Sequence, residues 1–377
     1  MLFPYQYIEN HSIYTLQEWM DDLYLNVWCT ADPTVDYDID LLPQDLKDIT
    51  LSIFYDARIT TDYLYGPIER VYNIFQGFDQ PTKDSLAQSY RDNNNVLDLC
   101  KQQNGCNPYV YTTLQSLNLT LKTELITFYK SLFTSVLHLK VVQDKIGTIV
   151  SHYNQFVTIN DERKCPFCGF NSIKGPNRTV RDAYDHYLPK DIYPFNSINF
   201  KNLAPMCHEC NSSHKLRQDP ITNPVKRTRR RAFFPYDIDN GYEINIDLTF
   251  TNSDINTLTE SDVIVNFTSP THQQEVDTWK EVFGIEERYK EKCVSKTDGR
   301  YWYIQATDEY DNYPDKVKVV YTRPEWIQKM IDEANRNKYA AGNFVKSAFL
   351  LACINSGILP SACSNHKGCL NILGILS

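Results

Sequence analysis

Glycine is scarce in this chain, at 13 of 377 residues. Backbones that wrap around phosphates or form long flexible linkers need glycine, because it reaches positive φ angles at little steric cost. Neither GxGxxG nor GxxxxGK[ST] occurs in the sequence. These absences argue against collagen-like, linker-rich and nucleotide-loop architectures.

Targeting and membrane-spanning signals are also missing. The first residues, MLFPYQYIENHS, do not place a charged segment before an apolar run, as a secretory signal would. An apolar stretch near the end, AFLLACINSGILP, has 13 residues, whereas a helix needs about 20 to span a bilayer. We therefore expect a cytoplasmic protein with no membrane partner.

Positive charge is in deficit overall, with 38 Lys and Arg against 47 Asp and Glu and a net charge of −9. Taken alone, this argues against a nucleic-acid partner. Residues 163–231 reverse the balance with 14 Lys and Arg against 5 Asp and Glu, a net +9, so the remainder carries −18. A basic block in an acidic protein suits a phosphate backbone, and a solvated charged face is the alternative.

Eleven cysteines, an odd number spread over a long chain, do not indicate a disulfide framework. Two Cys-x-x-Cys pairs stand out, and their members are Cys165, Cys168, Cys207 and Cys210. Four thiolates are the ligand set of closed structural zinc sites, and Pro166 and Gly169 suit a tight turn around the metal. We predict a structural zinc ion here, and none at the three Cys and His of 363–369, because three ligands do not fill a tetrahedral site.

The spacing of apolar residues predicts an α+β protein with three regions. Residues 1–157 are expected to be helical, with a polar loop in the middle of 84–109. Residues 158–236 hold both cysteine pairs, and residues 237–377 mix strands with helices. The expected strands are 242–250, 261–269, 300–308 and 316–322, and the expected helices of this region are 271–293 and 324–357.

Between the two cysteine pairs lies RDAYDHYLPK, a short strand with adjacent Asp185 and His186. Hydrolysis of a phosphodiester needs a hard divalent cation held by oxygen ligands. It also needs a base that is neutral near pH 7, which histidine provides. Neighbouring strand residues point to opposite faces, but at a strand end both can address one metal-bound phosphate.

These motifs resemble the HNH, or ββα-metal, nucleases of the type with a zinc knuckle. The resemblance covers about a fifth of the chain, through CPFCG, DH followed by LP, NLAPMC, and CHECN with a following HK. It extends loosely to HNH proteins of bacterial defence systems, in which a helical flank binds a partner such as an ATPase.

The resemblance implies a role for each matching residue. Asp185 would be a metal ligand and His186 the general base. Asn202 would pin the loop between the two strands and so orient the imidazole. Asn211 would supply a second oxygen to the metal, and His214, one helical turn on, would be a third ligand or a phosphate contact.

Two features depart from the family pattern. Asparagine at Asn211 takes the last position of the motif, which favours Mg²⁺ or Mn²⁺ over zinc as the catalytic ion. The Gly-Gly common in the inter-strand loop is replaced by DIYPFNSINF.

Basic residues after the second knuckle are expected to neutralise phosphates without reading the base sequence. They are Lys215, Arg217, Lys226, Arg227, Arg229, Arg230 and Arg231.

The function predicted from these residues is metal-dependent hydrolysis of DNA phosphodiester bonds, in a bacterial defence or restriction system, with a partner ATPase or self-association. Two alternatives stay open. One is an RNA nuclease or toxin with the same site, since a nonspecific phosphate clamp does not distinguish the sugars. The other is a non-catalytic zinc module that binds nucleic acid or a partner protein.

Overall fold

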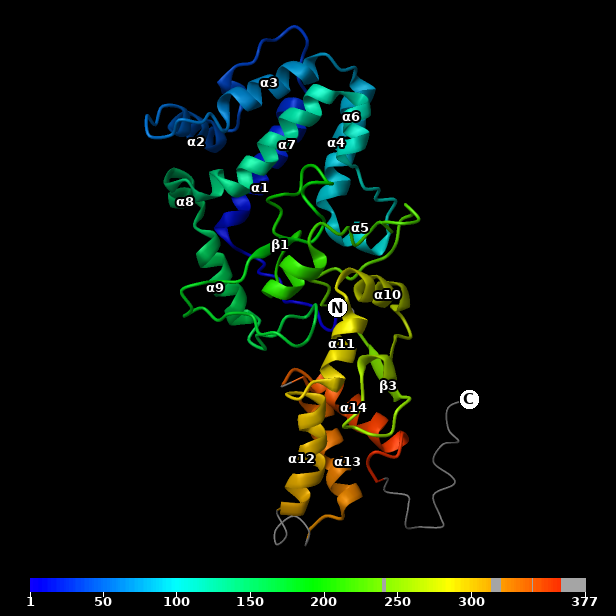
Figure 1. Cartoon of the computed structure of the whole chain (residues 1–377). Coiled ribbons are helices and arrows are strands. Elements are labelled where there is room, and N and C mark those ends of the chain that lie inside the picture. The colour runs from blue at the N-terminus through cyan, green and yellow to red at the C-terminus, as the bar shows by residue number, and fades with distance from the viewer. Residues whose placement is uncertain (239–241, 313–319, 341, 361–377) are drawn as a thin grey trace. The chain divides into compact units, whose positions relative to one another are not determined.

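The computed structural model describes residues 1–238, 242–312, 320–340 and 342–360 (Figure 1). The chain divides into two compact units. The first comprises residues 1, 3–167 and 172–241, and the second comprises residues 2, 168–171 and 242–377. Helices dominate both units and strands are few, so the α+β prediction is confirmed. Most of the strand expected over 316–322 lies outside the described residues. The two Cys and one His of 363–369 lie wholly outside them.

The first unit is a helical body that carries one small hairpin. Its longer helices are α1 (Thr15–Asp22), α2 (Gln44–Phe54), α3 (Tyr65–Gln76), α4 (Gln80–Asn94), α5 (Val96–Lys101), α6 (Tyr111–Leu117), α7 (Leu119–Thr134), α8 (Lys140–Ile146) and α9 (Ile149–Ile159). The short 3₁₀ helices are η1 (Ser12–Tyr14), η3 (Ile39–Leu41) and η4 (Val136–His138). Two further segments, η2 (Leu23–Trp28) and η5 (Cys210–Lys215), are π-helices. The strands β1 (Tyr184–His186) and β2 (Leu203–Pro205) pair antiparallel.

Aromatic side chains build the core of the first unit. Trp28 of η2 packs edge-on against Phe128 of α7, with ring centroids 5.5 Å apart. Tyr24 stacks on Tyr90 of α4 at 4.3 Å. All four rings are fully buried, and buried aromatic pairs add about 0.5–1.5 kcal/mol each beyond their area. The helices that carry them therefore form a fixed platform for the inter-strand loop described below.

The second unit is a two-stranded sheet with helices on one face. Strands β3 (Asn245–Phe250) and β4 (Val263–Thr268) pair antiparallel, which confirms the predicted hairpin. Its other elements are η6 (Glu260–Asp262), α10 (Gln273–Val282), α11 (Ile285–Val294), α12 (Gly299–Asn312), α13 (Arg323–Arg336) and α14 (Asn343–Asn355). Alternate residues of both strands are buried, so one sheet face packs on helices and the other faces solvent.

The strand predicted over residues 300–308 is wrong, because this segment belongs to helix α12. Its aromatic and apolar residues suggest a strand. The buried positions Gly299, Trp302 and Ala306 instead recur at helical spacing. A Cβ at Gly299 would lie 1.9 Å from the carbonyl oxygen of Cys293, so only glycine fits this approach. Packing against α11, α13 and α14 thus overrides the local strand preference.

The loop predicted within residues 84–109 is displaced, because α4 and α5 continue through the asparagine run to Lys101. Asp79 caps α4 by accepting a hydrogen bond from the Thr82 amide, and a proline in the first turn costs no hydrogen bond. The long helices predicted over 271–293 and 324–357 are each two helices. The first breaks at Gly284 and the second before Gly342, where φ is +56° and +74°.

Among the described residues, no single helix is both long and apolar enough to cross a bilayer. The stretch Leu119–His138 followed by Lys140–Ile146 meets the length and composition criteria only as a pair, which bends by 79° at its break.

Candidate functional site

The four predicted cysteine ligands lie together. The Sγ atoms of Cys165, Cys168, Cys207 and Cys210 are all within 4.8 Å of one another, and all four side chains are buried. Tetrahedral zinc with Zn–S bonds of about 2.3 Å needs S···S separations of roughly 3.8 Å, which this cluster accommodates. The cluster could therefore hold a metal ion such as zinc.

Tight turns bring each cysteine pair to the cluster. Gly169 follows the first pair with φ +77°, a conformation that side chains with a Cβ rarely adopt. In the second pair the Cys210 amide donates to Cys207 Sγ at 3.5 Å, and Cys210 begins the π-helix η5. In the described part of the chain, no other group of three or more His, Cys, Asp or Glu offers such clustered ligand atoms.

Asp185 lies in the middle of β1, paired with Ala204 of β2, and its side chain is buried. Its carboxylate oxygen is 2.9 Å from Nζ of Lys215, whose side chain is completely buried. Lys215 Nζ also donates to the carbonyl oxygen of His186 at 2.9 Å. Burial raises the pKa of Asp185, and the Lys215 ammonium partly offsets this effect. Lys215 thus holds the end of η5 against β1, rather than lying on the surface where a phosphate contact was expected.

His186 ends β1 and is 7% exposed. Its Nε2 lies 2.8 Å from the carbonyl oxygen of Ser197, so Nε2 carries the hydrogen and Nδ1 keeps the lone pair. Phe133 of α7 packs edge-on against the imidazole at 4.6 Å. Burial lowers the pKa of His186 to about 3, with a further contribution from Lys190. The imidazole is therefore neutral at pH 7, and its Nδ1 keeps a lone pair.

Asn202 spans the loop between the two strands. Its Oδ1 accepts from the Leu188 amide at 2.7 Å, and its Nδ2 donates to the carbonyl oxygens of Leu188 at 3.0 Å and Asn196 at 3.3 Å. The side chain is completely buried. Asn202 thus ties the start of the loop to its middle, immediately before the carbonyl of Ser197 that orients His186.

The helical body anchors the same loop from outside. Asn93 of α4 donates to the Pro194 carbonyl at 3.0 Å and exchanges hydrogen bonds with the main chain of Tyr109 at 2.8 Å. Ser197 Oγ donates to the carbonyl of Tyr129 in α7 at 2.7 Å. The asparagine run, for which the sequence predicts a loop, is therefore helical, and Asn93 in it holds the inter-strand loop beside His186 in place. We call this contact the Asn93 clamp.

The side chain of Phe195, in the middle of this loop, packs into the aromatic core of the first unit. Its ring packs edge-on against Tyr24 at 4.8 Å and Tyr129 at 5.8 Å, and it is completely buried. Its φ of +82° is unusual for a residue with a Cβ. Such a conformation costs about 1–3 kcal/mol and persists only where surrounding contacts impose it. The loop geometry is thus imposed by tertiary packing and not by its own turn residues.

Replacing Asn93 by alanine is expected to lower the free energy of unfolding by about 2–4 kcal/mol, because buried main-chain groups of Pro194 and Tyr109 lose their partners. Urea unfolding measures the change. Gln88→Ala, at an exposed position of the same helix, is the matched control and should change stability by less than about 0.5 kcal/mol. Equal stabilities for the two variants would contradict the clamp.

Asn211 and His214 both lie on η5, three residues apart. The Asn211 carbonyl accepts from the Leu216 amide at 3.0 Å, and Asn211 is partly exposed. His214 Nε2 is 3.8 Å from a carboxylate oxygen of Glu209. The residues expected to bind the catalytic ion are therefore distributed over β1 and η5, the two elements that Lys215 joins.

The predicted phosphate contacts divide into two groups. Arg217 is exposed and pairs with Asp191 at 3.2 Å, and Lys226 and Arg227 are exposed. Arg229 donates to the carbonyls of Ile221 and Leu99, and Arg230 donates to those of Pro220 and Asp219. Arg229, Arg230 and Arg231 are only partly exposed. Arg229 and Arg230 therefore fix the path of the chain as well as contributing positive charge.

A buried histidine connects α9 to β1. His152 Nδ1 lies 2.5 Å from the Tyr184 hydroxyl and Nε2 lies 2.9 Å from that of Tyr14. Tyr14 donates its proton to the Ile8 carbonyl at 2.8 Å, so it accepts from His152 Nε2 and leaves Nδ1 to accept from Tyr184. Burial lowers the pKa of His152 to about 3, helped by nearby His11. The hydrogen-bond network thus suits a neutral ring.

This depressed pKa predicts a loss of stability in acid. The unfolded chain protonates His152 below about pH 6.5 while the folded chain does not, so the free energy of unfolding falls as pH drops from 6.5 towards 3. Between pH 6.5 and 5, His152 alone should cost about 1.6 kcal/mol. Urea unfolding across this range should show a steeper decline for the native chain than for His152→Gln. Parallel curves would contradict the assignment.

Part of the chain is similar to the Septu protein PtuB of Bacillus thuringiensis, with 43% identity over 68 residues. The aligned residues make up 17% of this chain and 25% of that protein, so the chain spans about a quarter of the length of its relative. The chain is a partial homologue of a Septu protein. No family model matches the chain, and no solved structure matches it.

Several residues of the site carry no signal in the sequence. Ser197 acts through its carbonyl, Phe133 is one apolar residue of a long helix, and Asn93 lies more than a hundred positions from the loop it holds. The sequence does not indicate that Lys215 of the HK dipeptide is buried. Its proximity to CHECN was the available clue, because a lysine on the turn after a metal ligand can reach back to the strand carrying the acid.

Proposed function

We propose that this protein is a metal-dependent endonuclease that hydrolyses DNA phosphodiester bonds as the effector of a bacterial defence or restriction system. The observation that carries the proposal is the setting of His186. It is a neutral imidazole whose Nε2 is committed to the Ser197 carbonyl, and it follows Asp185 on a short hairpin. With Nε2 fixed by this hydrogen bond, Nδ1 is the nitrogen left to accept a proton beside a carboxylate that would bind the metal.

Two metal ions would have separate roles. The four cysteines offer soft thiolates in a closed set, which fits zinc as a structural ion. Asp185 and Asn211 offer oxygen donors, which fit Mg²⁺ or Mn²⁺. When bound, such an ion would stabilise negative charge on the scissile phosphate and on the leaving oxygen.

The chain's own residues would organise the reaction around that charge. His186 Nδ1 would take a proton from a water molecule, whose oxygen forms a bond to phosphorus while the bond from phosphorus to the ester oxygen breaks. The leaving oxygen takes a proton from solvent. Asn202 and Ser197 would keep the imidazole oriented, and His214 would contact the phosphate or the ion. Exposed Arg217, Lys226 and Arg227 would bind neighbouring phosphates.

Incubation with supercoiled plasmid and with RNA, each in Mg²⁺, Mn²⁺ or EDTA, tests the proposal. Metal-dependent cleavage of plasmid supports it. Cleavage of RNA alone would favour the RNA nuclease, and binding to nucleic acid without cleavage in any metal would favour a non-catalytic module. The partial similarity to a Septu protein supports the defence role. A partner ATPase or self-association is part of the same proposal.

A further inference from the structure

Strand β3 of the second unit has one edge that pairs with no described strand. The sheet has two strands, and β3 pairs with β4 along its other edge. The Thr251 amide donates to the Asp262 carbonyl at 3.0 Å just beyond β3. Because antiparallel bonds alternate, Thr249, Asp247 and Asn245 also face β4, and the main-chain groups of Ile246 and Leu248 face the open edge.

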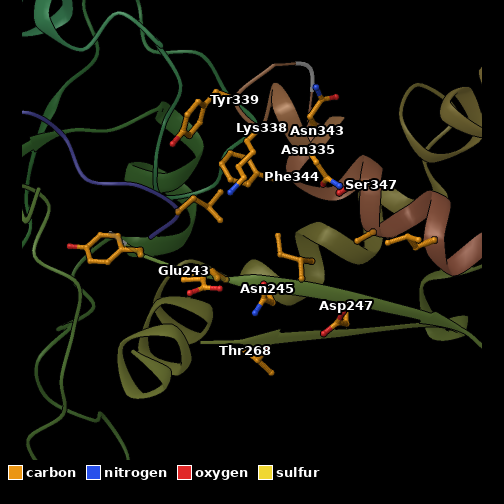
Figure 2. A pocket seen from close by; sticks show the side chains of 16 residues that line it. Glu243, Asn245, Asp247, Thr268, Asn335, Lys338, Tyr339, Asn343, Phe344 and Ser347 are labelled. Carbon is orange, nitrogen blue, oxygen red and sulfur yellow. The ribbon is translucent and has the colours of Figure 1, made fainter. Parts of the chain in front are cut away.

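A groove of about 560 Å³ runs beside this edge. Figure 2 shows β3 along one side of it and the side chains of α14 and of the end of α13 along the other. Ile246, Phe344 and Ala348 supply apolar surface, and Leu351 adds a side chain that is 44% exposed. Lys338 and Ser347 lie on the helical side.

Two acidic residues lie along β3 and the segment that leads into it. Asp247 of β3 and Glu243, two residues before the strand begins, both line the groove and are exposed, and β3 contains no lysine or proline. Proteins commonly protect exposed strand edges with lysine, proline or a bulge. The edge of β3 carries none of these within Asn245–Phe250, and the carboxylates favour a strand with positive charge beside it.

We propose that this groove binds an extended segment of a partner protein, which adds to the edge of β3 as a third strand. Main-chain groups of Ile246 and Leu248 bond the incoming strand. Its alternate apolar side chains enter the groove between β3 and α14. Its intervening side chains are lysine or arginine, which lie beside Glu243 and Asp247 on the solvent face. This surface belongs to the second unit, whereas the residues proposed for catalysis belong to the first, and the proposal does not depend on nuclease activity.

A labelled peptide of alternating lysine and valine, with a glutamate and valine peptide as its counterpart, tests the proposal against the full chain by fluorescence anisotropy. The lysine peptide should bind and the glutamate peptide should not. Charge reversal in Glu243→Lys with Asp247→Lys should weaken the lysine peptide about tenfold and allow the glutamate peptide to bind. Glu260→Lys, an exposed position on η6, is the control and should leave binding unchanged.

Amide hydrogen exchange separates strand addition from nonspecific charge attraction. The lysine peptide should slow exchange at Ile246 and Leu248, whose amides face the open edge. Three results would overturn the proposal: no binding, equal weakening by the Glu260→Lys control, or binding that leaves both amides unprotected. Self-association that the double reversal abolishes would also overturn it, because the occupant would then be a second copy of the chain.

Discussion

Replacing His186 by alanine is expected to slow plasmid cleavage by about 10²- to 10⁴-fold, the usual contribution of a general base. The loss follows from geometry, since Nδ1 is the ring atom left to accept a proton once Nε2 is committed to the Ser197 carbonyl. Rates of conversion from supercoiled to nicked plasmid, at saturating Mg²⁺ or Mn²⁺, measure the effect.

The control for this variant is His208→Ala. His208 lies between Cys207 and Cys210 and is exposed, so its loss should leave the cleavage rate within about twofold. Both variants should retain the zinc content of the native chain, and His208→Ala should also retain its melting temperature. His186→Ala removes a buried ring and leaves the Ser197 carbonyl without its partner, so it should melt at a lower temperature, and rates are compared where both variants are folded. If His186→Ala cut plasmid as fast as the native chain, His186 would not be the base.

Removing metal from the four-cysteine cluster is expected to unfold the region around it. Structural zinc contributes about 10–16 kcal/mol of apparent binding free energy in zinc-finger peptides, while whole domains are stable by only about 5–15 kcal/mol. A strong zinc chelator should therefore lower the melting temperature sharply as zinc is released, and Cys165→Ser should have the same effect without chelator.

Cys106→Ser provides the matched control for the cluster. Cys106 is half-buried, donates to the Asp92 carbonyl at 3.3 Å and belongs to no ligand cluster. This variant should bind as much zinc as the native chain and melt within a few degrees of it. A native chain that lost its zinc without any change in melting would show that the metal does not hold the fold together.

Local spacing was sufficient to predict the cluster and the hairpin of the second unit. Two Cys-x-x-Cys pairs predict four converging thiolates because each pair turns tightly around one metal, wherever the rest of the chain lies. The period of two in 242–250 and 261–269 predicts strands because one face of that hairpin is buried and the other is exposed.

Other features depend on partners distant in the chain and could not be predicted. The segment 300–308 favours a strand locally but becomes α12, because Trp302 packs on Phe349 of α14 at 5.6 Å. The polar asparagine run predicts a loop at Asn93 and Asn94. Both residues instead form hydrogen bonds to the loop that follows β1. The sequence predicts Lys215 as a surface cation. Its burial beside Asp185 depends on the packing of η5 against β1, which local spacing does not indicate.

The most direct test of the central claim measures plasmid cleavage and zinc content in the same samples. Zinc-loaded protein is freed of weakly bound ions with mild EDTA, then given Mg²⁺, Mn²⁺ or neither. The account predicts that zinc stays bound throughout and that plasmid is cut only after Mg²⁺ or Mn²⁺ is added. Cleavage with no added ion, or no cleavage with either ion by folded, zinc-loaded protein, would contradict it.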